Sequence, residues 1–132
     1  MDSIPYDMKF LKTHEWAKKD GSLIIVGVTD YAVEQLNREI VYVELPEVGC
    51  LLKKEESFGL IDAVKAASDL YAPMSGKVVE TNTEAMVNAA IVGEYPQNTG
   101  WLIKIDPSNP AEWDDLLSPA KYKALIESGE AH

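Results

Sequence analysis

The sequence predicts a mainly β domain with short helices, built as a small sandwich or barrel from which one hairpin projects. Two apolar, β-branched runs, Leu23–Val28 and Ile40–Leu45, predict buried strands. The C-terminal third instead combines capping residues, prolines and a helical spacing of apolar residues. At 132 residues the chain has the length of one ordinary domain. We expect a single domain over 1–132, with its core over about 20–106 and a helical segment over about 109–128.

The first strand is expected to lead into a short helix. Thr29 or Asp30 follows the first apolar run and can cap a helix that has Val33 and Leu36 on one face. A proline stops the second run, and Gly49 then lies at a turn position where a positive φ is tolerated. Strand, helix, strand and turn are therefore expected in this order.

The middle of the chain predicts a hairpin with a lysine at its tip. Extended character resumes over Phe58–Asp62 and again over Asp69–Ala72, and Lys65 lies between them among small and apolar neighbours. Gly76 is expected to form a turn before another strand over Lys77–Thr81. Because extended segments flank it on both sides, Lys65 should project from the sandwich as an exposed primary amine that can be acylated.

The chain changes character after these strands. Glu84–Thr99 is weakly patterned and is expected to be a long excursion around the sandwich. Trp101–Ile105 alternates as a half-buried strand should. Asn109 and Ser118 each precede a proline and should cap two short helices that close the domain.

Composition argues against several classes of partner. Twelve basic residues face 22 acidic ones, and a net charge of −10 opposes binding to nucleic acid or anionic lipid. Cys50 is the single cysteine, and the two histidines lie far apart without metal-ligand spacing, so no metal site is expected. No stretch resembles a signal peptide or a membrane span. We expect a monomer in the cytoplasm, or in the mitochondrial matrix if a transit peptide has been removed.

Five blocks, in order along nearly the whole chain, resemble the glycine cleavage system H protein family. The block around Lys65 is similar to that family's lipoyl-attachment region. The blocks are Thr13–Trp16, Val26–Ala32, Val43–Gly49, Phe58–Val79 and Gly100–Ile105. The resemblance implies a lipoyl-domain-like barrel-sandwich hybrid with an N-terminal extension and C-terminal helices, and it makes 1–132 a single lipoyl-carrier domain.

The resemblance also implies a function. A lipoate ligase or lipoyl transferase would join lipoate to Lys65 as an amide, with Asp62, Val64 and Ala66 forming the recognised attachment motif. The lipoyl arm would move the aminomethyl group of glycine between glycine decarboxylase, a folate-dependent aminomethyltransferase and dihydrolipoyl dehydrogenase. The bond-making and bond-breaking steps depend on the cofactors of the partner enzymes, so the chain is expected to be a carrier and not an enzyme.

Two acidic residues match acidic positions of the family and are candidate contacts of the loaded arm. Glu15 and Asp69 could pair with the protonated amine of the aminomethyl group in a partly desolvated cleft. Alternatively, Glu15 is an ordinary exposed acid and Asp69 a solvated hairpin residue. Gly49 and Gly76 are interpreted as hairpin-turn residues that the backbone requires.

Other assignments remain open on sequence alone. Biotin carriers use a similar hairpin, but their lysine lies in Met-Lys-Met, whereas Val64 and Ala66 flank it here. Asp62-Ala63 stands where the family commonly has Glu-Ser, and such departures alter surfaces that partners read. An H-like lipoate-binding protein, which serves heterodisulfide-reductase-like sulfur-oxidation proteins, is therefore the alternative. A relative without lipoate, which binds partners through its sandwich, is a third possibility.

Overall fold

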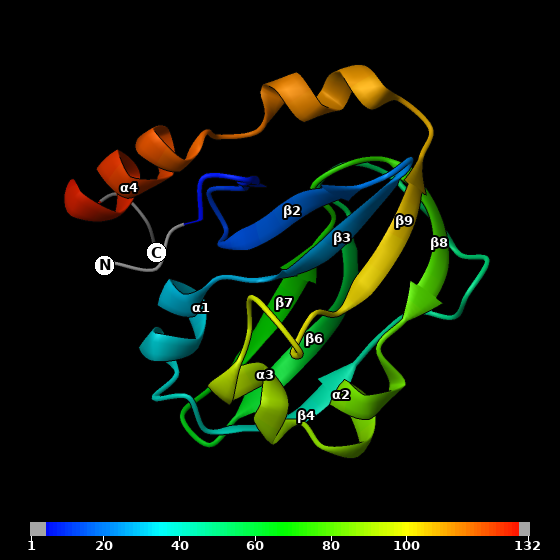
Figure 1. Ribbon diagram of the computed structural model, residues 1–132. Helices are drawn as coiled ribbons and strands as arrows, with labels where there is room; N and C mark the ends of the chain where they lie inside the picture. Colours follow the sequence, from blue (N-terminus) through cyan, green and yellow to red (C-terminus); the bar gives the residue numbers. More distant parts are fainter. Residues whose placement is uncertain (1–4, 130–132) are drawn as a thin grey trace.

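The structure, a computed structural model, describes residues 5–129 and contains two antiparallel sheets with helices around them (Figure 1). A six-stranded sheet has the order β1-β2-β3-β9-β8-β5, and a three-stranded sheet has the order β4-β6-β7. The strands are β1 (Met8–Phe10), β2 (Glu15–Asp20), β3 (Leu23–Val28), β4 (Ile40–Glu44), β5 (Leu51–Leu52), β6 (Ser57–Ala63), β7 (Ala67–Tyr71), β8 (Gly76–Thr81) and β9 (Ile103–Pro107). The helices are α1 (Asp30–Gln35), α2 (Thr83–Val87), α3 (Ala90–Glu94), the 3-10 helix η1 (Pro110–Asp115) and α4 (Pro119–Glu127).

The core is formed by the inward-facing side chains of both sheets. Val26 and Ile105 from the larger sheet and Val43 and Ile61 from the smaller one are almost fully buried and belong to one apolar cluster. Side chains alternate between the two faces of a strand, so each apolar run supplies every second residue to this cluster. The expected mainly β architecture with short helices is confirmed.

The N-terminal region departs from expectation. The core was expected to begin near residue 20, but β1 and β2 extend the six-stranded sheet and pair from Met8 to Asp20. β2 is not evident from the sequence, because only Glu15–Ala17 is buried and the charged second half of the strand is partly or fully exposed. A strand that leaves the core halfway along its length lacks the apolar pattern by which strands are predicted.

Glu84–Thr99 connects β8 to β9 as a long excursion, and it is more regular than its weak pattern suggests. It holds the short helices α2 and α3, which pack beside β4. Asn82 closes the segment, because its side-chain amide donates to the carbonyls of Thr99 and Trp101 at 2.9 and 2.7 Å. The strand expected over Trp101–Ile105 forms two residues later, as β9.

The two short helices expected in the C-terminal segment both form, and one of them has the expected cap. Ser118 caps α4 by accepting a hydrogen bond from the Lys121 amide at 3.2 Å. Asn109 makes no side-chain cap, and the helix that begins after it, η1, is a 3-10 helix. Figure 1 shows η1 and α4 crossing one end of the sheet, with α4 beside the N-terminal strands.

The two glycines predicted to form turns have different roles. Gly49 has φ +98° in the turn after β4, as expected. Gly76 lies in β8 and not in a turn, which corrects the prediction. A β-carbon on Gly76 would approach the Asp106 carbonyl oxygen to 2.4 Å, so glycine is needed there for the close pairing of β8 with β9.

Candidate functional site

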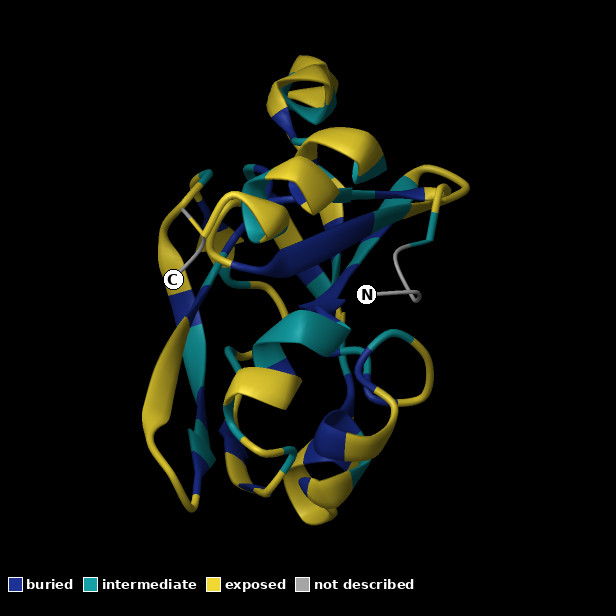
Figure 2. Cartoon of the chain, turned by 90° about the vertical axis from the view of Figure 1, so that its left-hand side faces the viewer, coloured by how far each residue is buried: buried dark blue, intermediate teal, exposed yellow. Residues whose placement is uncertain are grey.

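The hairpin of β6 and β7 presents Lys65 at its tip. Val64, Lys65 and Ala66 connect the strands, and all three are exposed. The Ala63 amide donates to the Ala66 carbonyl at 2.9 Å, and the Val64 amide donates to the Glu39 carbonyl at 3.1 Å. Backbone hydrogen bonds therefore fix the tip while its side chains stay in solvent. Figure 2 shows the tip and the first half of β7 in the colour of exposed residues.

The Lys65 amine lies against the C-terminal end of α1. Its Nζ donates to the carbonyl of Gln35 at 3.0 Å. Unpaired carbonyls at a helix end attract cations, so this contact is favourable for a charged amine. Gln35 also lines a cavity of about 480 Å³, and Lys65 therefore lies at the edge of that cavity.

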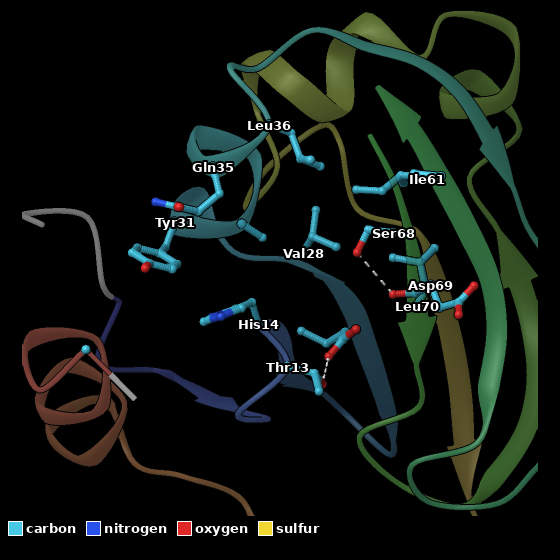
Figure 3. A pocket seen from close by; sticks show the side chains of 14 residues that line it. Thr13, His14, Val28, Tyr31, Gln35, Leu36, Ile61, Ser68, Asp69 and Leu70 are labelled. Carbon is cyan, nitrogen blue, oxygen red and sulfur yellow. Dashed lines mark hydrogen bonds between the residues drawn. The ribbon is translucent and has the colours of Figure 1, made fainter. Parts of the chain in front are cut away.

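The cavity is enclosed by α1, β7 and the segment that leads into β2 (Figure 3). Its walls are of two kinds. Val28, Leu36 and Ile61 make an apolar wall, and Glu15 with His14 supplies a polar one. Such a mixture suits a flexible apolar chain that ends in a polar or charged group.

Glu15 is the buried acid of this cavity. Its residue is 1% exposed, and its carboxylate accepts hydrogen bonds from the Tyr71 amide at 2.9 Å and from the Thr13 hydroxyl. Burial raises the pKa of Glu15 to about 7, although both hydrogen bonds act in the opposite direction. The alternative of an ordinary exposed acid is therefore wrong, and Glu15 can gain or lose a proton near neutral pH.

Asp69 lines the cavity without directing its carboxylate into it. Its neighbour Ser68 pairs with the buried Ile61, whereas Asp69 pairs with Leu60 and so lies on the outer face of the sheet. In Figure 3 the Asp69 carboxylate points away from the cavity. The two predicted acidic contacts are thus near the same cavity, but only Glu15 offers its charge there.

A tyrosine from the C-terminal helix holds the polar wall together. The hydroxyl of Tyr122 lies 2.8 Å from Nδ1 of His14 and 2.7 Å from the hydroxyl of Thr29, and all three residues are buried. Its ring stacks on Phe10 with the centroids 4.4 Å apart. Burial raises the pKa of Tyr122 well above its ordinary value, so the phenol stays neutral. His14 itself has φ +78°, a conformation that this contact helps to hold.

Sequence reasoning missed the roles of Tyr122, Thr29 and Gln35 in this site. The sequence places Tyr122 in the expected helical segment over about 109–128 without a role, yet a buried tyrosine needs a hydrogen-bond partner for its hydroxyl. That requirement is the signal that could have pointed to a buried polar partner. The attachment-motif residues Asp62, Val64 and Ala66 all surround the tip. Among residues 5–129, no group of three His, Cys, Asp or Glu side chains could hold a metal ion, and no helix could cross a membrane.

The sequence and the structure were compared with known proteins. Residues 8–129 match the family described as glycine cleavage H-protein. The chain is 50% identical to the glycine cleavage system H protein of Carboxydothermus hydrogenoformans, over 96% of this chain and 97% of the relative. It is 43% identical to a mitochondrial glycine cleavage system H protein of Oryza sativa, over 95% of this chain and 76% of the relative.

A solved structure agrees with these relatives. The crystal structure of a glycine cleavage system H protein from Mycobacterium marinum superposes with a TM-score of 0.84 at 35% identity, covering 93% of this chain and 98% of that one. Sequence identity and fold therefore agree over nearly the whole chain. The protein belongs to the glycine cleavage H-protein family, whose members bear lipoate.

Proposed function

We propose that the protein is a lipoyl carrier of glycine cleavage, with lipoate joined to Lys65. Lipoate on Lys65 would supply a cyclic disulfide, which can be reduced while one sulfur takes up the aminomethyl group of glycine and can be oxidised again after that group has passed to folate. The partners would be a lipoate ligase or lipoyl transferase, glycine decarboxylase, the aminomethyltransferase and dihydrolipoyl dehydrogenase. One observation carries the proposal: in a chain of this family, the motif lysine is exposed at a hairpin tip beside a cavity.

The residues around Lys65 fit a lipoyl arm. The amine is exposed, so an enzyme can reach it without unfolding the hairpin. The contact of Nζ with the Gln35 carbonyl is a single hydrogen bond, which an amide N–H could also make. The apolar wall next to it offers cover for a hydrocarbon chain.

Glu15 would stabilise the positive end of the cargo. A carboxylate that is nearly removed from water forms a strong charge-assisted hydrogen bond with an ammonium group. The pKa of about 7 would fall when such a cation binds, because an opposite charge favours the ionised acid. Asp69 would act at longer range, since its carboxylate lies on the outer face.

The chain itself would not be an enzyme, because decarboxylation, folate transfer and reoxidation are chemistry of the partners' cofactors. We also propose a monomer located in the cytoplasm. The mitochondrial matrix is the alternative, and the rice relative is a mitochondrial protein by name.

Lipoylation at Lys65 is tested by incubating the protein with lipoate and a lipoate ligase. Intact mass and peptide mapping should place one lipoyl group on Lys65, none on Lys65→Arg, and one on the control Lys77→Arg, which changes another exposed lysine. The lipoylated protein should then support glycine-dependent exchange of carbon dioxide by glycine decarboxylase. Modification that persists in Lys65→Arg contradicts the assignment. Lipoylation without exchange favours the sulfur-oxidation partners.

The role of Glu15 is tested on protein loaded with the aminomethyl group. Glu15→Gln should release ammonia spontaneously about tenfold faster than wild type, because a hydrogen bond to a charged group contributes about 1.5–3 kcal/mol. Asp69→Asn should remain within about twofold, since that carboxylate is solvated. The rates are followed by ammonia release from purified loaded protein. Equal effects of the two substitutions would contradict the separate roles.

A further inference from the structure

The outer face of the three-stranded sheet exposes large apolar side chains next to Lys65. Val64 is 68% exposed at the tip, and Val41 and Tyr42 on β4 are 59% and 50% exposed. On the same strand Val43 is 2% exposed, so the inner face is packed while the outer one is not. Clustered exposed apolar residues, aromatic ones above all, are typical of binding surfaces.

Register places these side chains together. Tyr42 pairs with Asp62 and the buried Val43 pairs with Ile61, so Tyr42 and Asp62 share the outer face. Val64 lies two residues beyond Asp62, and its amide is bonded to the carbonyl of Glu39, just before β4. We call Val41, Tyr42, Asp62 and Val64 the tip face.

A bulge enlarges the tip face. The register of β4 against β6 shifts between Ile40 and Tyr42, which leaves Val41 as an additional residue without a partner on β6. Two consecutive apolar side chains, Val41 and Tyr42, are exposed as a result. Bulges are common in edge strands such as β4 and next to active sites, where they redirect a side chain.

The surroundings of the tip face are acidic. Glu44 pairs with Leu60, which pairs with Asp69, so these two acids lie on the outer face beside Asp62. Throughout β4, β6, β7 and the tip, all of which the structure describes, Lys65 is the only lysine or arginine. A partner that covers this face should present an apolar contact surrounded by basic side chains.

Of the proposed partners, the enzyme that acylates Lys65 is the one that has to bind closest to the tip face. An enzyme that acylates the ε-amine must come within one lysine side chain of the hairpin backbone, so it has to touch the residues that flank Lys65. Enzymes that act at the far end of a lipoyl arm can bind further away, because the arm adds to their reach. The acylating enzyme is therefore the partner that must contact the residues immediately around the tip.

Resting on the proposed function, we propose that the tip face is the docking surface of the enzyme that acylates Lys65, with Tyr42 as its central contact. In that step the neutral amine attacks the carbonyl of an activated acyl donor, such as an acyl thioester. The bond from Nζ to this carbonyl forms, the bond to the activating group breaks, and the amine loses a proton. The hydrogen bond from Nζ to the Gln35 carbonyl must be released beforehand.

The test measures the rate of lipoylation by a lipoate ligase at several concentrations of carrier. Tyr42→Ser should lower kcat/KM about tenfold or more, mainly through a higher KM, because central aromatic contacts contribute at least about 2 kcal/mol. Tyr95→Ser is the matched control, since Tyr95 is 56% exposed and lies outside this sheet. Val64→Ser provides a second substitution in the tip face, in case Tyr42→Ser fails to fold.

The outcomes separate this proposal from the proposed function. Lipoylation of wild type, with a raised KM for Tyr42→Ser or Val64→Ser and an unchanged one for Tyr95→Ser, supports the docking surface. Equal KM values for all variants overturn it and leave the carrier function intact. Normal lipoylation of Tyr42→Ser with loss of glycine-dependent exchange also overturns it, because the face would then serve a later partner. Wild-type protein that accepts no lipoate overturns both.

Discussion

The hairpin tip and the buried wall of the cavity serve one site by opposite physical means. At the tip, Val64, Lys65 and Ala66 are exposed, the backbone is held by hydrogen bonds, and the Lys65 amine makes one hydrogen bond to the Gln35 carbonyl. In the wall, Glu15 is almost completely buried, as is Tyr122 behind His14, and the polar atoms of both are hydrogen-bonded. Presenting an amine requires little stabilisation, whereas sheltering a charged group requires polar atoms inside the protein, which cost free energy unless they are paired.

The largest effect expected from this contrast is a pH dependence of the folding stability that is caused by Glu15. Its pKa is about 7 when folded and close to its ordinary 4.5 when unfolded. The folded state therefore binds the proton more tightly, so the stabilising contribution is present below pH 4.5 and is lost as the pH rises through 7. We expect the stability of wild type relative to Glu15→Gln to fall by about 3 kcal/mol between pH 4.5 and pH 8.

Urea unfolding of both proteins at several pH values checks this expectation. Subtracting the two curves removes the titration of groups that the variants share. A difference that stays constant, or that rises with pH, would mean that Glu15 is ionised in the folded protein and that the wall is more polar than its burial implies.

A smaller effect is expected at Tyr122. Tyr122→Phe removes the hydroxyl that joins His14 to Thr29 and should cost about 2 kcal/mol of unfolding free energy. Thermal unfolding should show a Tm lower by roughly 5–10 °C, with lipoylation of Lys65 unchanged. Val64→Ser at the tip should change stability by less than about 0.5 kcal/mol, as exposed substitutions usually do. Similar losses for both variants would remove the contrast between tip and wall.

The sequence predicted the tip well because its determinants are local. Apolar alternation gave β3, β4, β6 and β8 nearly in place, and the motif residues around Lys65 lie within a few positions of one another. The wall could not be predicted, because it joins His14, Thr29 and Tyr122 from three distant segments. Glu15 was identified through the family resemblance, but its burial depends on those tertiary contacts.

Other differences also arise from tertiary context. β2 was missed because its charged half leaves the core, and Asn109 was expected to cap a helix but makes no side-chain cap. Asp69 was grouped with Glu15 because both match acidic positions of the family, and only the register of β6 with β7 reveals that the Asp69 carboxylate lies on the outer face of the sheet. Each of these cases required knowledge of which face of an element is covered.

The bond between His14 and Tyr122 also has a consequence for the order of events during translation. These residues are 108 positions apart, and at about 5–20 residues per second the ribosome adds Tyr122 about 5–20 s after His14. The β6–β7 hairpin contacts α1 and β4, which precede it in the sequence, so all of these segments are made well before α4. A nascent chain thus holds the whole acceptor hairpin before it holds the residue that completes the wall of the cavity.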